Sequence, residues 1–204
     1  MFIFLITFTG CKQEKNTYKY VASTSWVAAI AQLAGIDEID TIAPAELKHP
    51  PEYEITPNDI LKVSKADLFI HAGYEAMMNT ISTATKIDKQ KIVKISTKNQ
   101  VEVLESAVAL LAEKAGTSAI ANQRFSEYKK MILQAQEKVK STCANRLSVY
   151  VNTNQLPLAQ DLGLNIIGTF GPSPLTSTQI AEIAKLVKAE VGSFSWAVIG
   201  TGNA

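Results

Sequence analysis

The sequence predicts an α/β protein of two lobes, each with a mainly parallel sheet flanked by helices, joined by one long helix. Three observations predict it. Apolar, strand-like runs alternate with helix-like stretches from residue 18 to about residue 116. Residues 118–140, which contain neither Gly nor Pro, follow directly on another helix and interrupt this alternation. The alternation resumes after residue 147. Because strand–helix alternation is typical of parallel sheets with right-handed crossovers, each alternating region is predicted to form one lobe.

The first alternating region contains four predicted strands and four predicted helices. The strands are predicted at residues 18–23, 39–44, 66–73 and 91–96, and the helices at 26–33, 57–65, 75–86 and 101–111. The second helix has the clearest start. Thr56 is suited to cap it, Pro57 to its first turn, and Asp59 to the positive end of its dipole.

The long helix and the second alternating region follow. The helix carries one apolar stripe whose members are spaced alternately by four and three residues: Ala121, Phe125, Tyr128, Ile132, Ala135 and Val139. Strands are then predicted at 147–152, 164–170 and 193–200, and helices at 153–162 and 176–189. The last helix carries its own apolar stripe, formed by Ile180, Ile183, Ala184 and Val187.

The N-terminus has the pattern of an export signal. An apolar run from Phe2 to Phe8 leads through Thr9 and Gly10 to Cys11, and the chain then becomes polar. This segment resembles a bacterial lipoprotein signal, which implies that Cys11 is lipidated and anchors the protein outside the cytoplasm.

These patterns divide the chain into five parts. We expect a signal peptide at 1–11, a tether at 12–17, an N-terminal lobe at 18–116, a linking helix at 117–142 and a C-terminal lobe at 143–204. The C-terminal lobe is expected to be incomplete, because the pattern is lost beyond about Val191, as a truncation or a frameshift would produce.

Composition excludes several functions. The net charge of +1, without a basic stripe, argues against a nucleic-acid partner. With Cys11 lipidated, Cys143 is the only other cysteine, so no disulfide framework or cysteine-based zinc site is expected. No nucleophile elbow, His-Glu-x-x-His motif or Walker loop occurs, so we expect no enzyme. The Gly-x-Gly at 200–202 is too short a match to indicate nucleotide binding.

Two stretches carry a resemblance to a known family. They are HPPEYEITPNDILKVSKADLFIHAG at 49–73 and LPLAQDLGLNIIGTFGPSPLTSTQIAEIAKLVK at 156–188. In order and spacing they resemble segments of the metal-binding solute-binding proteins of ABC importers, the ZnuA/TroA-like group. The resemblance implies a monomeric protein that holds a divalent metal ion, zinc or manganese, between its lobes and delivers it to an ABC permease.

The candidate metal ligands are His49, His71, Glu75 and Asn152. The resemblance places its first histidine at Pro51, and the nearest histidine here is His49. It places a second histidine within 95–103, which reads ISTKNQVEV, and a third at Asn152. Ligands in open parallel sheets lie outside the carboxyl ends of the strands, where these segments are expected to meet.

Alternative interpretations remain open for the ligand and for single residues. The protein could bind a metal through a changed set that includes Glu52, or could bind a siderophore, haem or cobalamin-type ligand. It could also be a surface adhesin or a truncated relative with a degenerate cleft. His71 could instead cap a buried strand, and Glu75 could complement a helix dipole. Trp26 could line the cleft, although an aromatic residue at helical spacing is more often in the core, and Asn154 and Gln155 could be either cap or ligand-binding amides.

Overall fold

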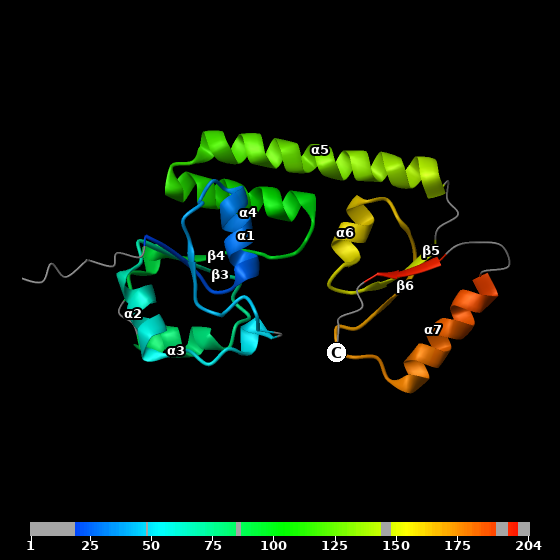
Figure 1. Ribbon diagram of the computed structural model, residues 1–204, viewed down its shortest axis with the longest axis horizontal. Helices are drawn as coiled ribbons and strands as arrows, with labels where there is room; N and C mark the ends of the chain where they lie inside the picture. The colour runs from blue at the N-terminus through cyan, green and yellow to red at the C-terminus, as the bar shows by residue number, and fades with distance from the viewer. Residues whose placement is uncertain (1–18, 48, 85–86, 144–147, 191–195, 200–204) are drawn as a thin grey trace, which may run out of the picture.

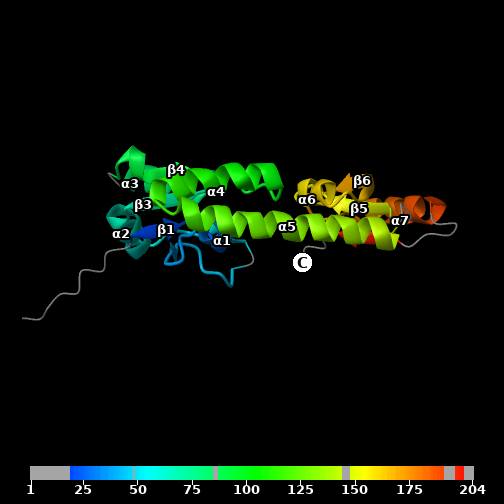
Figure 2. The ribbon, with the colours of Figure 1, turned by 90° about the horizontal axis from the view of Figure 1, so that it is seen from above.

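The computed structural model describes residues 19–47, 49–84, 87–143, 148–190 and 196–199. Two lobes lie side by side, and the long helix α5 (Ser118–Cys143) runs across both of them (Figures 1 and 2). The predicted signal peptide and tether, with Cys11, lie outside the described residues. No helix within the described ranges is long and apolar enough to cross a membrane.

The N-terminal lobe contains a parallel four-stranded sheet in the order β2-β1-β3-β4. The four predicted strands are confirmed and are shorter than predicted: β1 (Tyr20–Ala22), β2 (Asp40–Thr41), β3 (Leu68–His71) and β4 (Ile92–Lys94). The helices are α1 (Ser25–Leu33), α2 (Pro57–Lys65), α3 (Met77–Ala84) and α4 (Val101–Ala115), with short 3-10 turns at Pro50–Glu52 and Lys89–Lys91.

Apolar side chains on both faces of this sheet form two cores. In β3, Leu68 and Ile70 pack with α1, α4 and α5, whereas Phe69 packs with α2 and α3. This is the alternation expected of a strand, and both faces are apolar because helices cover both.

The predicted start of α2 is confirmed in detail. The Thr56 hydroxyl accepts a hydrogen bond from the Asp59 N–H at 3.3 Å, and the Asp59 carboxylate accepts one from the Thr56 N–H at 2.9 Å. This reciprocal arrangement satisfies two N–H groups that the first turn of a helix leaves unpaired. Tyr53 donates to the same carboxylate at 3.1 Å, which ties the preceding loop to the helix.

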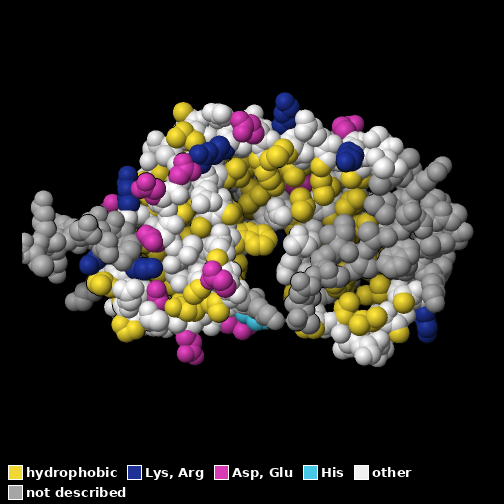
Figure 3. Space-filling view, in the orientation of Figure 1, with side chains coloured by type: hydrophobic (Ala, Val, Ile, Leu, Met, Phe, Trp, Pro, Cys, Tyr) yellow, Lys and Arg dark blue, Asp and Glu magenta, His cyan; other side chains and the backbone are white. Residues whose placement is uncertain are grey.

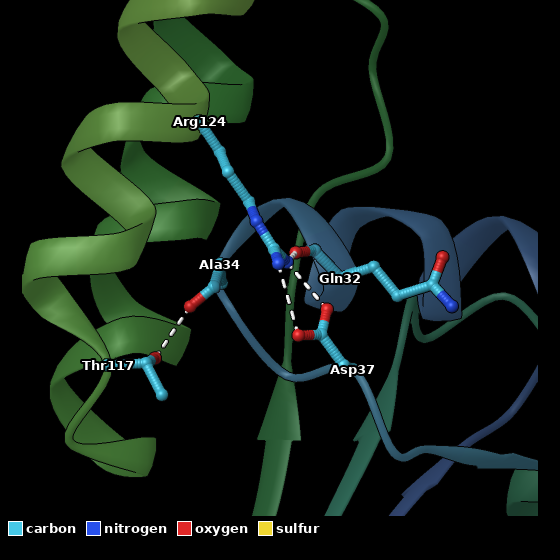
Figure 4. Close-up of polar contacts among 5 residues, drawn as sticks. All are labelled: Gln32, Ala34, Asp37, Thr117 and Arg124. Atoms are coloured by element: carbon cyan, nitrogen blue, oxygen red, sulfur yellow. Dashed lines mark hydrogen bonds and ion pairs between the residues drawn. The ribbon is translucent and has the colours of Figure 1, made fainter.

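Helix α5 is held to the N-terminal lobe at its first half. Ala121 and Phe125 of the predicted stripe are buried, while Tyr128, Ile132 and the later members are half-buried. Polar contacts join the start of α5 to the end of α1 (Figure 4). Thr117 donates to the Ala34 carbonyl at 2.6 Å. Arg124 donates to the Gln32 carbonyl at 2.6 Å and to both oxygens of Asp37. The carbonyls that end α1 thus have partners.

The C-terminal lobe contains a parallel three-stranded sheet in the order β6-β5-β7. The strands are β5 (Ser148–Asn152), β6 (Asn165–Phe170) and β7 (Trp196–Ile199), and the helices are α6 (Leu156–Asp161) and α7 (Ser177–Glu190). All three predicted strands are confirmed.

Two details of this lobe were not predicted. Helix α6 starts three residues late, because the segment after β5 forms a turn in which the Gln155 N–H donates to the Asn152 carbonyl at 2.8 Å. Ile180, which belongs to the predicted apolar stripe of α7, is 54% exposed. The described part of the chain leaves that face of α7 open to solvent.

A hydrogen bond between α4 and α6 also joins the two lobes. The Asp161 carboxylate, at the end of α6, accepts from the Val101 N–H at 2.6 Å, at the start of α4. Gln100, which precedes α4, makes no capping hydrogen bond through its side chain. A carboxylate of the C-terminal lobe therefore caps a helix of the N-terminal lobe, where the helix dipole favours a negative charge.

Candidate functional site

A cleft of about 580 Å³ lies between the two lobes. The space-filling view shows the molecule hollowed at this junction (Figure 3). Residues that follow strands of both sheets line the cleft: Trp26, Pro51, Tyr74, Thr97, Lys98, Thr153, Asn154, Gln155 and Pro157. The cleft therefore opens outside the carboxyl ends of β1, β3, β4 and β5, where ligands of parallel α/β sheets bind.

The cleft continues into a second pocket on the N-terminal lobe. This pocket has a volume of about 500 Å³, and Tyr74, Thr97 and Lys98 line both spaces. Lys94 lines the second pocket, and its side chain lies against Gly73. A Cβ at Gly73 would come within 2.3 Å of the Lys94 Cε, and its φ of +93° also favours glycine.

A buried carboxylate organises the ends of β1 and β3 beside the cleft. The Ser23 hydroxyl donates to Glu75 Oε1 at 2.5 Å, and the N–H groups of Ala72 and Gly73 donate to its two oxygens at 2.8 and 2.6 Å. Burial opposes ionisation of Glu75, but these hydrogen bonds outweigh burial and lower the pKa of the carboxyl. The carboxylate is thus held by the ends of β1 and β3, and α3 begins two residues after it, at Met77.

His71 ends β3 and is buried. Its ring stacks on Phe69 with centroids 5.9 Å apart, and its Nδ1 has no hydrogen-bond partner among the described residues. Burial lowers the pKa of the imidazole; the Glu75 charge opposes this and the Lys94 charge adds to it. The lowered pKa favours the neutral imidazole; its unpartnered Nδ1 is buried, and His71 lines neither the cleft nor the adjoining pocket.

This pKa predicts a pH dependence of stability. In metal-free protein, the free energy of unfolding should fall as the pH falls below 6.5, by at most about 1.4 kcal/mol per pH unit. Just below pH 6.5 the imidazole binds a proton in the unfolded chain but not yet in the folded protein, because its pKa is lower when the protein is folded. Urea unfolding between pH 5 and 7.5 with a chelator measures the slope. His71→Gln should flatten it and His49→Gln should retain it; an unchanged slope in His71→Gln would contradict this assignment.

The four candidate metal ligands occupy different environments. His71 and Glu75 lie close enough to interact electrostatically. His49 is exposed before the 3-10 turn, and Asn152 uses its Oδ1 to accept from the Asn154 N–H at 2.9 Å. Within the described ranges, no three His, Cys, Asp or Glu side chains form a group that could hold a metal ion. Pro51, where the resemblance places a histidine, lines the cleft.

Five of the residues that line the cleft were not predicted individually from the sequence: Tyr74, Thr97, Lys98, Thr153 and Pro157. The rule that ligands lie beyond strand ends could have identified Lys98 and Tyr74, since both follow strands closely. Of the two interpretations of Trp26, the cleft-lining one is confirmed: the residue is 51% exposed and lines the cleft.

Solved structures with the same fold are known. The laminin-binding protein Lbp of Streptococcus pyogenes has a TM-score of 0.62 at 18% identity, over 84% of this chain and 75% of that chain. A cadmium-bound periplasmic metal-binding protein from Candidatus Liberibacter asiaticus has a TM-score of 0.58 at 16% identity, over 91% and 81%. The metal-dependent lipoprotein YcdH from Bacillus subtilis has a TM-score of 0.56 at 17% identity, over 84% and 75%.

The chain has the fold of these proteins. The predicted fold class is therefore confirmed, and so is the resemblance at the level of the fold. No protein-family model matches the sequence. No curated protein sequence matches it significantly.

Proposed function

We propose that this protein is an extracytoplasmic solute-binding protein that captures its ligand between the two lobes and delivers it to an ABC permease. The observation that carries the proposal is the cleft at the carboxyl ends of both parallel sheets, spanned by α5. The fold shared with a periplasmic metal-binding protein and a metal-dependent lipoprotein supports it. We propose that the protein acts as a monomer without catalytic activity.

The proposed mode of attachment is a lipid anchor on Cys11. A short apolar run that ends in Gly10-Cys11 supports this anchor, and so does the polar segment that follows it. Stable anchoring by acyl chains needs about two lipid chains, which a lipidated N-terminal cysteine would supply. The protein would thus stay at the membrane surface beside its permease.

The proposed solute is a divalent transition metal, zinc or manganese. His71 supports this assignment, because a neutral imidazole with an unpartnered ring nitrogen is what these metals need. Glu75, His49 and Asn152 are the further proposed ligands. Glu75 is engaged by three donors, so metal binding would require it to exchange at least one of them.

Thermal unfolding with added metal tests this proposal. At about 100 times the dissociation constant, zinc or manganese should stabilise the folded protein by about 2.7 kcal/mol and raise its melting temperature by several degrees. His71→Gln and His49→Ala should each reduce the increase. Magnesium, which prefers oxygen ligands, is the control. Cooperative melting that neither metal shifts would contradict metal capture, and a shift unaltered in both variants would contradict the ligand set.

A second candidate, a larger organic ligand in the same cleft, is favoured by one observation. The cleft volume lies in the range of small-molecule sites, about 300–1,000 Å³. A single metal ion would fill little of its 580 Å³.

A further inference from the structure

The charges that line the cleft have one sign. Lys98 lines both the cleft and the adjoining pocket, and Lys94 lines the pocket. Neither ammonium forms an ion pair within the described part of the chain. No Asp or Glu among the described residues lines either space. Such a lining attracts an anion.

The walls of the cleft are those of a site for an organic molecule. Trp26 and Tyr74 are 51% and 60% exposed, so each offers the cleft a partly uncovered aromatic ring. On the opposite lobe, Asn154 and Gln155 contribute amide groups that can donate and accept hydrogen bonds. Aromatic side chains with a few polar groups are typical of small-molecule sites.

We propose that the cleft binds a small organic acid with a planar unsaturated group, either free or as its metal complex. Lys98 would pair with the carboxylate, Trp26 and Tyr74 would stack on the planar group, and the amides of Asn154 and Gln155 would bind its polar substituents. This inference rests on the proposed function only in placing the solute in the cleft. It also explains how a metal could be held without three protein ligands, because the acid would supply the missing donors.

Calorimetric titration of the full chain tests this inference. The probes are salicylate, citrate, zinc and manganese, each alone, and then each acid mixed with each metal. Salicylate is planar and both acids chelate metals, whereas citrate lacks a ring. Salicylate should bind more tightly than citrate. Lys98→Gln should weaken salicylate binding by about tenfold, since a lost charge-assisted hydrogen bond costs roughly that factor. Trp26→Leu should reduce the preference for salicylate over citrate, and Lys130→Gln, an exposed lysine of α5, should change nothing.

Each outcome decides one point. Binding of salicylate alone would show that the cleft accepts a free acid. Binding only with metal present would show that the cleft accepts the acid as its metal complex. Binding of metal alone, with no effect of either acid, would overturn the inference and leave the proposed function standing. Salicylate binding that is unaltered in both Lys98→Gln and Trp26→Leu would overturn the assignment of the cleft. No binding of any probe would overturn both proposals.

Discussion

Replacing Glu75 with alanine should lower the free energy of unfolding by about 3–5 kcal/mol, as measured by urea unfolding. The carboxylate is buried and accepts hydrogen bonds from Ser23, Ala72 and Gly73. Its removal leaves the donors of Ser23 and Ala72 buried without partners, which costs more than the hydrogen bonds contribute. The same change should loosen the segment between β3 and the cleft residue Tyr74.

Two further variants separate this effect from a general loss of charge. Glu54→Ala removes an exposed carboxylate and should change the free energy of unfolding by less than about 0.5 kcal/mol. The loss of unfolding free energy in Glu75→Gln should lie between those of Glu54→Ala and Glu75→Ala. The amide oxygen of Gln can still accept a hydrogen bond, but its NH₂ group faces another donor. If Glu75→Ala is as stable as the original protein, the buried hydrogen bonds carry no net stability.

The lowered pKa of Glu75 adds a pH signature to the same experiment. Because the carboxyl ionises more readily when folded, its contribution is fully present above the ordinary value of 4.5. It is lost as the pH falls through the lower, folded value. The original protein should therefore lose stability below pH 4.5 more steeply than Glu75→Gln does.

Replacing Phe125 with alanine should destabilise the protein by about 3–5 kcal/mol. Phe125 is the buried aromatic residue by which α5 packs into the core of the N-terminal lobe. The centroids of its ring and the Tyr128 ring lie 5.5 Å apart. The truncation leaves a cavity at the place where the bridging helix meets the sheet-covering helices. The arrangement of the two lobes depends on this attachment.

The matched control for Phe125 lies on the same helix. Met131 is 59% exposed, so Met131→Ala should cost less than about 0.5 kcal/mol in the same urea titration. Equal losses in the two variants would contradict the assignment of Phe125 as the packed contact of α5. A loss confined to Phe125→Ala would identify the packed contact as the anchor.

Local signals explain which elements were predictable. The capping box of Thr56 and Asp59 acts within four residues, so its chemistry is complete in the sequence. The stripe that begins at Ala121 and Phe125 predicted α5 because the helical period alone brings its members onto one face. Strand positions followed in the same way from short apolar runs, although their ends moved by a few residues.

The full set of residues in and beside the cleft could not be predicted, because segments far apart in the sequence bring them together. The Ser23–Glu75 hydrogen bond joins residues 52 positions apart, and only the pairing of β1 with β3 brings them together. Trp26 has the spacing of a core residue on α1, yet it faces the cleft because the C-terminal lobe does not cover it. Periodicity alone cannot distinguish a buried face from one that lines a cleft.

The sequence by itself determined the α/β alternation, the long helix and the start of α2, because these follow from side-chain periodicity and hydrogen bonds between near neighbours. The tertiary structure alone decided which strand ends meet at the cleft and which lysines line it. It also decided that Glu75 is fully hydrogen-bonded while the Nδ1 of His71 is not. These features arise from the packing of segments far apart in the chain, and no local pattern encodes the distances between them.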